Sequence, residues 1–245
     1  MPKFDNMQTT VLAGGGNFQF SAIRPDKLGA TEYTLVSIVV DVSSSVNSFK
    51  KALLDCIKSI IQGCQRSPRA DNLMVRLLTF NDSRQEIHGF VPLNQIDPNS
   101  YAALQCSGAT ALYDACYDAI AATNTYGKTL FDQDFGVNAA VYIITDGEDN
   151  RSTVTPKMIA KQVHDISKDE FLESMITVLV GVNTANSTSS GYLQLFQTEA
   201  GLNQFVEIDA ATPDKLAKLA AFVDKSIRSQ SQALGTGSAS QLLTF

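Results

Sequence analysis

Two short runs of apolar residues constrain the fold more than any other feature of this chain. Residues 33–40 read Tyr-Thr-Leu-Val-Ser-Ile-Val-Val, and residues 139–144 read Ala-Ala-Val-Tyr-Ile-Ile. Runs this short and this rich in β-branched residues predict strands buried on both faces, which is typical of a parallel sheet. Both are far shorter than the ~20 residues that cross a bilayer, so we expect no membrane span.

Segments with helical periodicity alternate with predicted strands. After the first strand, apolar residues recur at Phe49, Leu53, Ile57 and Ile60, which is the spacing of one helix face. Further helices are expected at 110–123, 155–167, 191–200 and 213–228, and further strands at 73–80, 86–93, 176–182 and 204–208. This alternation predicts an α/β fold of three layers, in which helices cover both faces of an open, mostly parallel sheet. We expect residues 86–93 to form one antiparallel edge strand.

The ends of the chain differ in composition from its centre. Residues 1–32 are weakly patterned around Gly14-Gly15-Gly16 and are expected to form an arm or hairpin. Residues 33–228 carry the alternation and form the predicted domain. Residues 229–245 are rich in Ser, Gln, Gly and Ala, which predicts a flexible tail, although the apolar end at Leu242, Leu243 and Phe245 could dock on another surface.

Charge and cysteine content exclude several classes of function. With 19 Lys and Arg against 25 Asp and Glu, the net charge is −6, and no basic cluster could neutralise a nucleic-acid backbone. Four cysteines are too few for a disulfide scaffold. The first residues do not show the pattern of a secretory signal. We therefore expect a protein of the reducing cytoplasm.

Oxygen-bearing side chains follow the predicted strands and precede one helix. In open α/β sheets ligands bind beyond the carboxyl ends of the strands, so loops at these ends are the candidate site. Three separate loops supply a carboxylate or hydroxyl there, at Asp41, Ser43, Ser45, Thr110 and Asp146. A set that has only oxygen ligands suits a hard cation, Mg²⁺ or Mn²⁺.

These residues resemble the metal-ion-dependent adhesion site of the von Willebrand factor A (vWA) domain family. The family pattern is Asp-x-Ser-x-Ser, a distant Thr in a Gly-containing loop, and Asp in a Thr-Asp-Gly segment. The chain has Asp41-Val42-Ser43-Ser44-Ser45, then Ser107-Gly108-Ala109-Thr110, then Thr145-Asp146-Gly147. Ser44 stands where the family commonly has glycine. The resemblance covers roughly residues 33–228 and is nearest to intracellular microbial members of the tellurium-resistance type.

The resemblance implies a role for each of the five residues. Ser43 and Ser45 would bind the cation directly, Thr110 directly or through water, and Asp41 and Asp146 would supply negative charge. The cation would then take an acidic side chain of another protein as its remaining ligand. A non-enzymatic interaction module in an intracellular stress, defence or ATPase-associated assembly is therefore the leading prediction.

Other interpretations of the same residues stay open. Asp41 could be the nucleophile of a Mg²⁺-dependent phosphatase of the haloacid-dehalogenase type. Such enzymes, however, require a second acidic residue two positions after the nucleophile, where this chain has Ser43. The candidate residues could instead only cap helices and close turns. In a third interpretation the chain is a structural subunit that self-assembles through residues 1–32 or 229–245.

Overall fold

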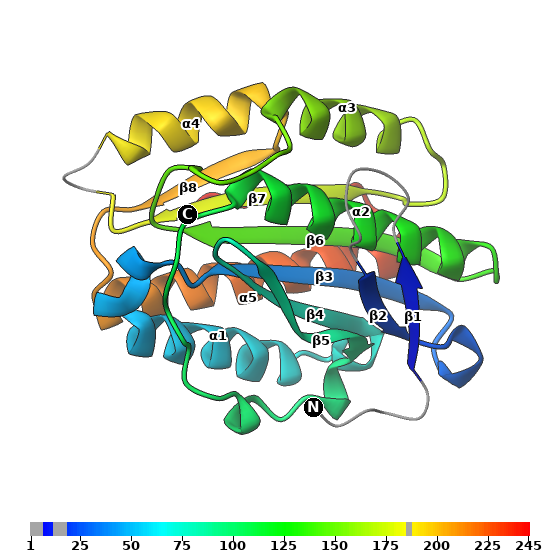
Figure 1. Ribbon diagram of the computed structural model, residues 1–245. Coiled ribbons are helices and arrows are strands. Elements are labelled where there is room, and N and C mark those ends of the chain that lie inside the picture. Colours follow the sequence, from blue (N-terminus) through cyan, green and yellow to red (C-terminus); the bar gives the residue numbers. More distant parts are fainter. Residues whose placement is uncertain (1–6, 12–18, 185–187) are drawn as a thin grey trace.

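The computed structural model describes residues 7–11, 19–184 and 188–245. Gly14-Gly15-Gly16 lie outside these ranges. The described residues form an eight-stranded sheet in the order β1-β2-β5-β4-β3-β6-β7-β8, with helices on both faces (Figure 1). The strands are β1 (Met7–Val11), β2 (Gln19–Ile23), β3 (Glu32–Asp41), β4 (Leu73–Phe80), β5 (Arg84–Pro92), β6 (Gly136–Thr145), β7 (Met175–Val182) and β8 (Gln204–Ile208). The helices are α1 (Lys50–Gln65), α2 (Leu112–Phe131), α3 (Pro156–Ile166), α4 (Ser189–Glu199) and α5 (Pro213–Thr236).

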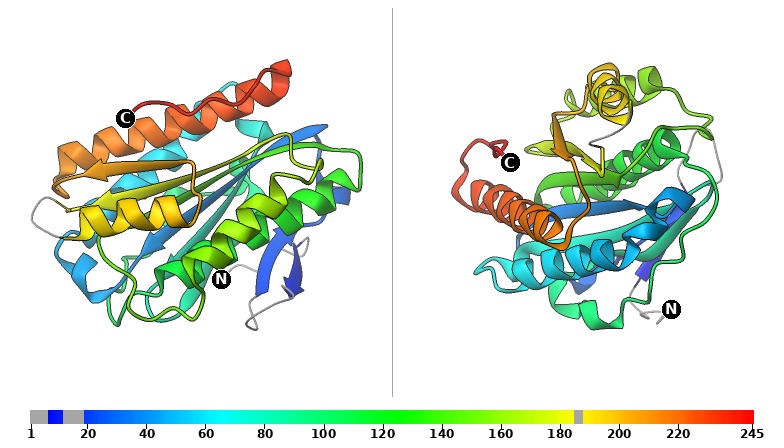
Figure 2. Two further views of the ribbon diagram at one scale, coloured as in Figure 1. Left: turned by 90° about the horizontal axis from the view of Figure 1, so that it is seen from above. Right: turned by 90° about the vertical axis from the view of Figure 1, so that its left-hand side faces the viewer.

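The predicted three-layer α/β architecture is confirmed. Strands β3, β4, β6, β7 and β8 are mutually parallel neighbours. Helices α1 and α5 pack on one face of this sheet, and α2, α3 and α4 cover the other, as both views of Figure 2 show. The two predicted apolar runs lie in the central strands β3 and β6, where every residue of 33–40 and 139–144 is buried on one face or the other. The arrangement is consistent with a vWA-type fold.

One detail of the predicted sheet was wrong. Strand β5 is antiparallel to β4, as expected, but it is not at the edge. The antiparallel pair β1 and β2 extends the sheet beyond it, with Ala22 of β2 beside Phe90 of β5. Phe20, Ala22 and Ile23 are buried in the core under α2. Strands β1 and β8 are therefore the edges of the sheet.

The last helix continues past Arg228, where the prediction ended it. Residues 229–236 were interpreted as part of a flexible tail because of their Ser and Gln content, yet α5 runs to Thr236. Gln230, Ala233 and Leu234 are buried at helical spacing, and Ala, Leu and Gln are good helix formers. At the other end, Thr212 caps the helix, since its hydroxyl accepts from the Lys215 amide. In the parts of the chain that the structure describes, no helix has the length and apolar character to span a membrane.

Candidate metal centre

The register of the central strands brings two predicted site loops together. Val40 of β3 lies beside Ile144 of β6, so Asp41 and Thr145 end neighbouring strands at the same edge of the sheet. The Thr145 hydroxyl donates to Asp41 Oδ2 at 2.6 Å. Because the chain turns after each of these strands, the side chains that follow Asp41 and Thr145 also meet at this edge.

Four of the five predicted residues form one hydrogen-bonded chain. Asp41 Oδ1 accepts from the Ser43 amide at 2.7 Å. Ser45 Oγ donates to Asp146 Oδ1 at 2.7 Å and lies 3.1 Å from Ser43 Oγ. Since Ser45 uses its hydrogen on Asp146, Ser43 must be the donor of the bond between the two serines. The Ser43 hydrogen thus points to Ser45 and the Ser45 hydrogen to Asp146. Each of the two serine oxygens keeps a lone pair that could face a cation.

Thr110 is placed beside this chain by its backbone. Its amide donates to Asn150 Oδ1 at 2.9 Å, and its carbonyl accepts from the Asn150 amide at 3.0 Å. Two residues earlier, the Gly108 carbonyl accepts from both the amide and the hydroxyl of Ser44. The loop of Thr110 therefore lies against the other two loops, although its side chain is not part of the chain of hydrogen bonds from Asp41 to Asp146.

Both carboxyl groups of the site have raised pKa values. Burial raises the pKa of Asp41 from 3.8 to about 6, partly offset by the hydrogen bonds from Thr145 and Ser43, and the charge of Asp146 adds to the increase. Burial also raises the pKa of Asp146. A carboxylate that is buried beside a second carboxylate is stabilised by a nearby cation. The electrostatics of this edge therefore favour a positive ligand.

The donor set fits a hard dication. Two carboxylates and three hydroxyls are oxygen ligands of the kind that Mg²⁺ and Mn²⁺ prefer. Within residues 7–11, 19–184 and 188–245, no three His, Cys, Asp or Glu side chains form a group that could hold a metal. Any ion at this edge would therefore depend on the serine and threonine hydroxyls.

Several residues that hold these loops were given no role from the sequence. Thr145 orients Asp41, and Asn150 joins the loop after β6 to Thr110. Asp149 accepts from the Tyr113 amide at 3.1 Å at the start of α2. These contacts link separate loops, and no local pattern reveals such links.

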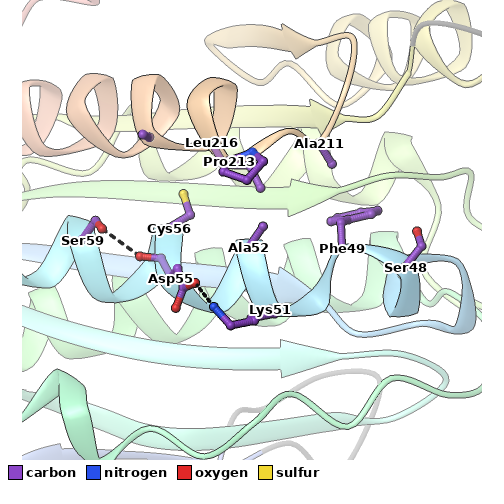
Figure 3. Close-up of a pocket in the computed structure, with 11 residues that line it drawn as sticks. Ser48, Phe49, Lys51, Ala52, Asp55, Cys56, Ser59, Ala211, Pro213 and Leu216 are labelled. Atoms are coloured by element: carbon purple, nitrogen blue, oxygen red, sulfur yellow. Dashed lines mark hydrogen bonds and ion pairs between the residues drawn. The ribbon is translucent and has the colours of Figure 1, made fainter.

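A separate hollow of about 380 Å³ lies between α1 and the start of α5. Phe49, Ala52 and Leu216 contribute apolar walls, and the ion pair of Lys51 with Asp55 lies at its side (Figure 3). None of the five predicted site residues lines it. The hollow is therefore not part of the candidate metal centre.

Comparison with known proteins supports the fold but does not show a closer relationship to any of them. No protein-family model and no curated protein matches the sequence. Among solved structures, a mutant of the PilB minor pilin from Streptococcus sanguinis shares 15% identity with a TM-score of 0.60, over 91% of this chain and 67% of the pilin. The SpaC pilus adhesin from Lactobacillus rhamnosus GG shares 11% identity with a TM-score of 0.57, over 94% of this chain and 34% of the adhesin.

A third similar structure is described as holding a metal. It is proximal thread matrix protein 1 from the mussel byssus, in a form with zinc in its MIDAS motif, the metal-ion-dependent adhesion site. It shares 18% identity with a TM-score of 0.53, over 82% of this chain and 46% of the matrix protein. The chain thus spans between about a third and two thirds of these proteins, and identities this low show a common fold alone.

Proposed function

We propose that this protein is a non-enzymatic interaction module that binds an acidic side chain of another protein through Mg²⁺ or Mn²⁺. The cation would be held by Asp41, Ser43, Ser45, Thr110 and Asp146. The observation that carries the proposal is the hydrogen-bonded chain from Thr145 through Asp41, Ser43 and Ser45 to Asp146. It gathers two carboxylates and two hydroxyls from two loops at one edge of the sheet.

The charge of this set supports a role in recognition. Two carboxylates balance the charge of a dication, while neutral hydroxyls as direct ligands leave the ion able to attract a further anion. The remaining coordination position would then favour a carboxylate from outside the chain. The zinc-containing matrix protein of similar fold supports the placing of a metal at such a site.

The surroundings of Asp41 argue against the phosphatase alternative. The Asp41 side chain is 0% exposed, and both of its oxygens accept hydrogen bonds. A nucleophilic carboxylate needs an open path to the phosphorus atom, which this placement does not offer. The three similar structures are described as a minor pilin, a pilus adhesin and a thread matrix protein, which supports a binding role. The cytoplasmic, stress-related setting stays a prediction from the sequence.

The first experiment is a titration of the metal-free protein with Mg²⁺ and Mn²⁺, followed by calorimetry and by thermal unfolding. We expect one saturable site, with a gain in unfolding free energy of about 2.7 kcal/mol when the free ion is a hundred times its dissociation constant. The variant Asp41→Ala/Asp146→Ala should lose both signals. The matched control is Asp132→Ala/Asp165→Ala, which removes two exposed acids that pair with lysines elsewhere.

A second experiment tests the anionic ligand separately from the metal. With Mn²⁺ bound, a carboxylate that enters the coordination shell should show enhanced relaxation of its protons, so acetate serves as a minimal probe and ethanol as the neutral control. We expect the effect for acetate alone, and its loss in Asp41→Ala/Asp146→Ala. Binding of Mn²⁺ without any effect on acetate would contradict the carboxylate ligand and leave the metal site standing.

A further inference from the structure

The start of α4 contacts the loop of residues 146–150, here named the metal-site loop because it carries Asp146. In Figure 1 this helix starts at the side of the sheet where β3 and β6 end. The hydroxyl of Thr188, the N-cap residue of α4, donates to Glu148 Oε1 at 3.1 Å. The same side chain makes no bond to the amides of its own helix. Thr188 therefore uses its hydroxyl to hold the metal-site loop rather than to cap α4.

A pair of tyrosines joins α4 to the start of α2. Tyr113 lies in the first turn of α2 and Tyr192 in the first turn of α4, and their hydroxyls are hydrogen-bonded to each other. The two rings are stacked, with 10° between their planes and 6.5 Å between their centroids. The Tyr113 ring also packs at 4.6 Å on the ring of Phe196, which is 2% exposed. These contacts fix both hydroxyls relative to the domain.

Asp149 of the metal-site loop lies against this pair. Its Oδ2 accepts from the Tyr113 amide at 3.1 Å. Burial raises the pKa of Tyr192, and the Tyr113 hydroxyl and the nearby backbone amide of Asp149 oppose that increase, while the charge of Asp149 adds to it. Glu148 and Asp149 come two and three residues after Asp146. Helix α4 thus contacts the loop directly beside a proposed metal ligand.

We propose that the first turn of α4 positions the metal-site loop, and that Thr188 and Tyr192 couple binding of the cation to this helix. The inference rests on the cation site proposed above. Mg²⁺ demands near-ideal octahedral geometry, with oxygen ligands at about 2.0–2.1 Å. A loop that is free to move must be ordered when the ion binds, and that ordering lowers the affinity. Contacts that hold the loop in advance remove this penalty.

Such coupling acts in both directions. If α4 holds the loop for the ion, the bound ion must also hold α4 through the same contacts. The carboxylate of Glu148 suits this role, because it lies at the start of α4, where the helix dipole attracts negative charge. The alternative is that Thr188 and Tyr192 only pack α4 against the domain. Binding of the ion would then not depend on their hydroxyls.

Calorimetric titration with Mg²⁺ distinguishes the two cases. The variant Thr188→Val/Tyr192→Phe removes both hydroxyls and nearly preserves the shapes of the side chains. We expect its affinity for Mg²⁺ to be about fivefold lower, at the lower end of typical coupling between sites. Thr188→Ser, which keeps the hydroxyl, should bind like the unaltered protein. Equal affinities of the double variant and the unaltered protein would overturn the proposal.

The variant Tyr126→Phe separates positioning from a general loss of stability. Tyr126 lies in the second half of α2, and its hydroxyl donates to the Ile23 carbonyl at 2.8 Å. The substitution removes a buried hydrogen bond but no contact of the metal-site loop, so the affinity for Mg²⁺ should not change. A decrease as large as that of the double variant would overturn the proposal, because destabilisation alone would then account for both.

Hydrogen exchange tests the reverse direction. In the unaltered protein, exchange in residues 189–199 should be about fivefold slower with saturating Mg²⁺ than with EDTA, because the bound ion disfavours local opening of α4. The double variant should lose this difference, and residues 84–92 of β5 serve as the internal control. Saturable binding with unchanged exchange in α4 would overturn the coupling alone. Absence of Mg²⁺ binding by the unaltered protein would instead contradict the cation site itself.

Discussion

Thr145 donates its hydroxyl hydrogen to Asp41 across 2.6 Å, and so joins the last residue of β6 to the last residue of β3. Both side chains are buried, at 1% and 0% exposed. The bond occupies one oxygen of Asp41, while the other accepts from the Ser43 amide. Thr145 is therefore a positioning residue, because it fixes the orientation of the carboxylate behind the two serines.

Thr145→Val should weaken binding of Mg²⁺ without removing any proposed ligand. Loss of a hydrogen bond that orients a metal-site carboxylate typically costs about ten- to a hundredfold in affinity. Calorimetric titration of Mg²⁺ measures this change. The matched control is Thr123→Val, which removes a buried hydroxyl that bonds within α2 and should leave the affinity unchanged. An unaltered affinity in Thr145→Val would show that the bond does not position Asp41 for a metal.

The raised pKa of Asp41 predicts a particular dependence of stability on pH in metal-free buffer. The folded pKa is about 6 and the ordinary value 3.8, so between these values the folded state binds more protons than the unfolded state. The contribution of Asp41 to the free energy of unfolding therefore falls from about pH 4 to about pH 6 and is constant above about pH 6. A difference of about two pKa units corresponds to about 3 kcal/mol.

Comparison with Asp41→Asn isolates this contribution from other titrating groups. The variant should gain stability relative to the unaltered protein as the pH rises from 4 to 7, with the change centred between the two pKa values. Chemical denaturation with EDTA present, at four or more pH values, measures the difference. A difference that does not change with pH would mean that Asp41 titrates alike in the folded and unfolded states.

The strands of the parallel part of the sheet could be predicted from the sequence because their signals are local. In β4 and β8 the predicted and observed bounds coincide at 73–80 and 204–208, since each is a short segment of mainly apolar residues next to turn-forming residues. The predicted start of α5 at Pro213 also coincides with the observed one. The end of that helix could not be predicted, because two polar residues of its last two turns, Gln230 and Ser231, are also buried and interrupt the apolar pattern. Asn138 of β6 donates to the Gln230 carbonyl, and Arg69 donates to the Ser231 hydroxyl.

The candidate site could be predicted only as a set of residues. Motif spacing selected Asp41, Ser43, Ser45 and Asp146, and the structure brings these four together. The contacts that shape the site depend on register between strands and on backbone bonds between loops, as for Thr145 and Asn150. Such contacts lie far apart in the sequence, so the pattern of residues does not contain them. Whether a metal binds there stays a prediction.

The hairpin of β1 and β2 shows why the sheet edge was wrongly predicted. It joins β5 through one short parallel contact at Ala22 and Phe90, and neither strand carries a signal that identifies the other as its partner. The backbones of β2 and β5 lie close together at Gly89, where an added Cβ atom would lie 1.9 Å from the backbone carbonyl oxygen of Ser21. Only a residue without a side chain permits this approach.

Gly89→Ala should therefore release the hairpin from β5. Because the obstructing atom belongs to the backbone, the strands must separate, and we expect a loss of about 1–3 kcal/mol in unfolding free energy. Hydrogen exchange should rise at residues 19–23 and much less in β3 and β6. Gly29→Ala, which meets nothing within 4 Å, is the control. Unchanged exchange at 19–23 in Gly89→Ala would show that the hairpin tolerates the displacement.

A buried ion pair ties the same hairpin to the sheet and gives the last prediction. Arg76 of β4 is 0% exposed and donates from Nε to Glu86 of β5 at 2.8 Å, while Glu86 also accepts from the amide and hydroxyl of Ser21. Burial lowers the pKa of Arg76 and the charge of Glu86 opposes this. Glu86→Gln keeps the size of the side chain but removes the charge that balances the guanidinium.

We expect Glu86→Gln to lower the unfolding free energy by about 3 kcal/mol, because one charge of a buried pair then lacks its principal counter-charge. The comparison is Asp132→Asn, whose pair with Lys128 is more than half exposed on both sides, and which should cost under about 1 kcal/mol. Chemical denaturation of the two variants measures both values. Equal costs would mean that water reaches the Arg76 guanidinium and screens its charge, and the hairpin would then be held by Phe20 and Ile23 in the core rather than by the ion pair.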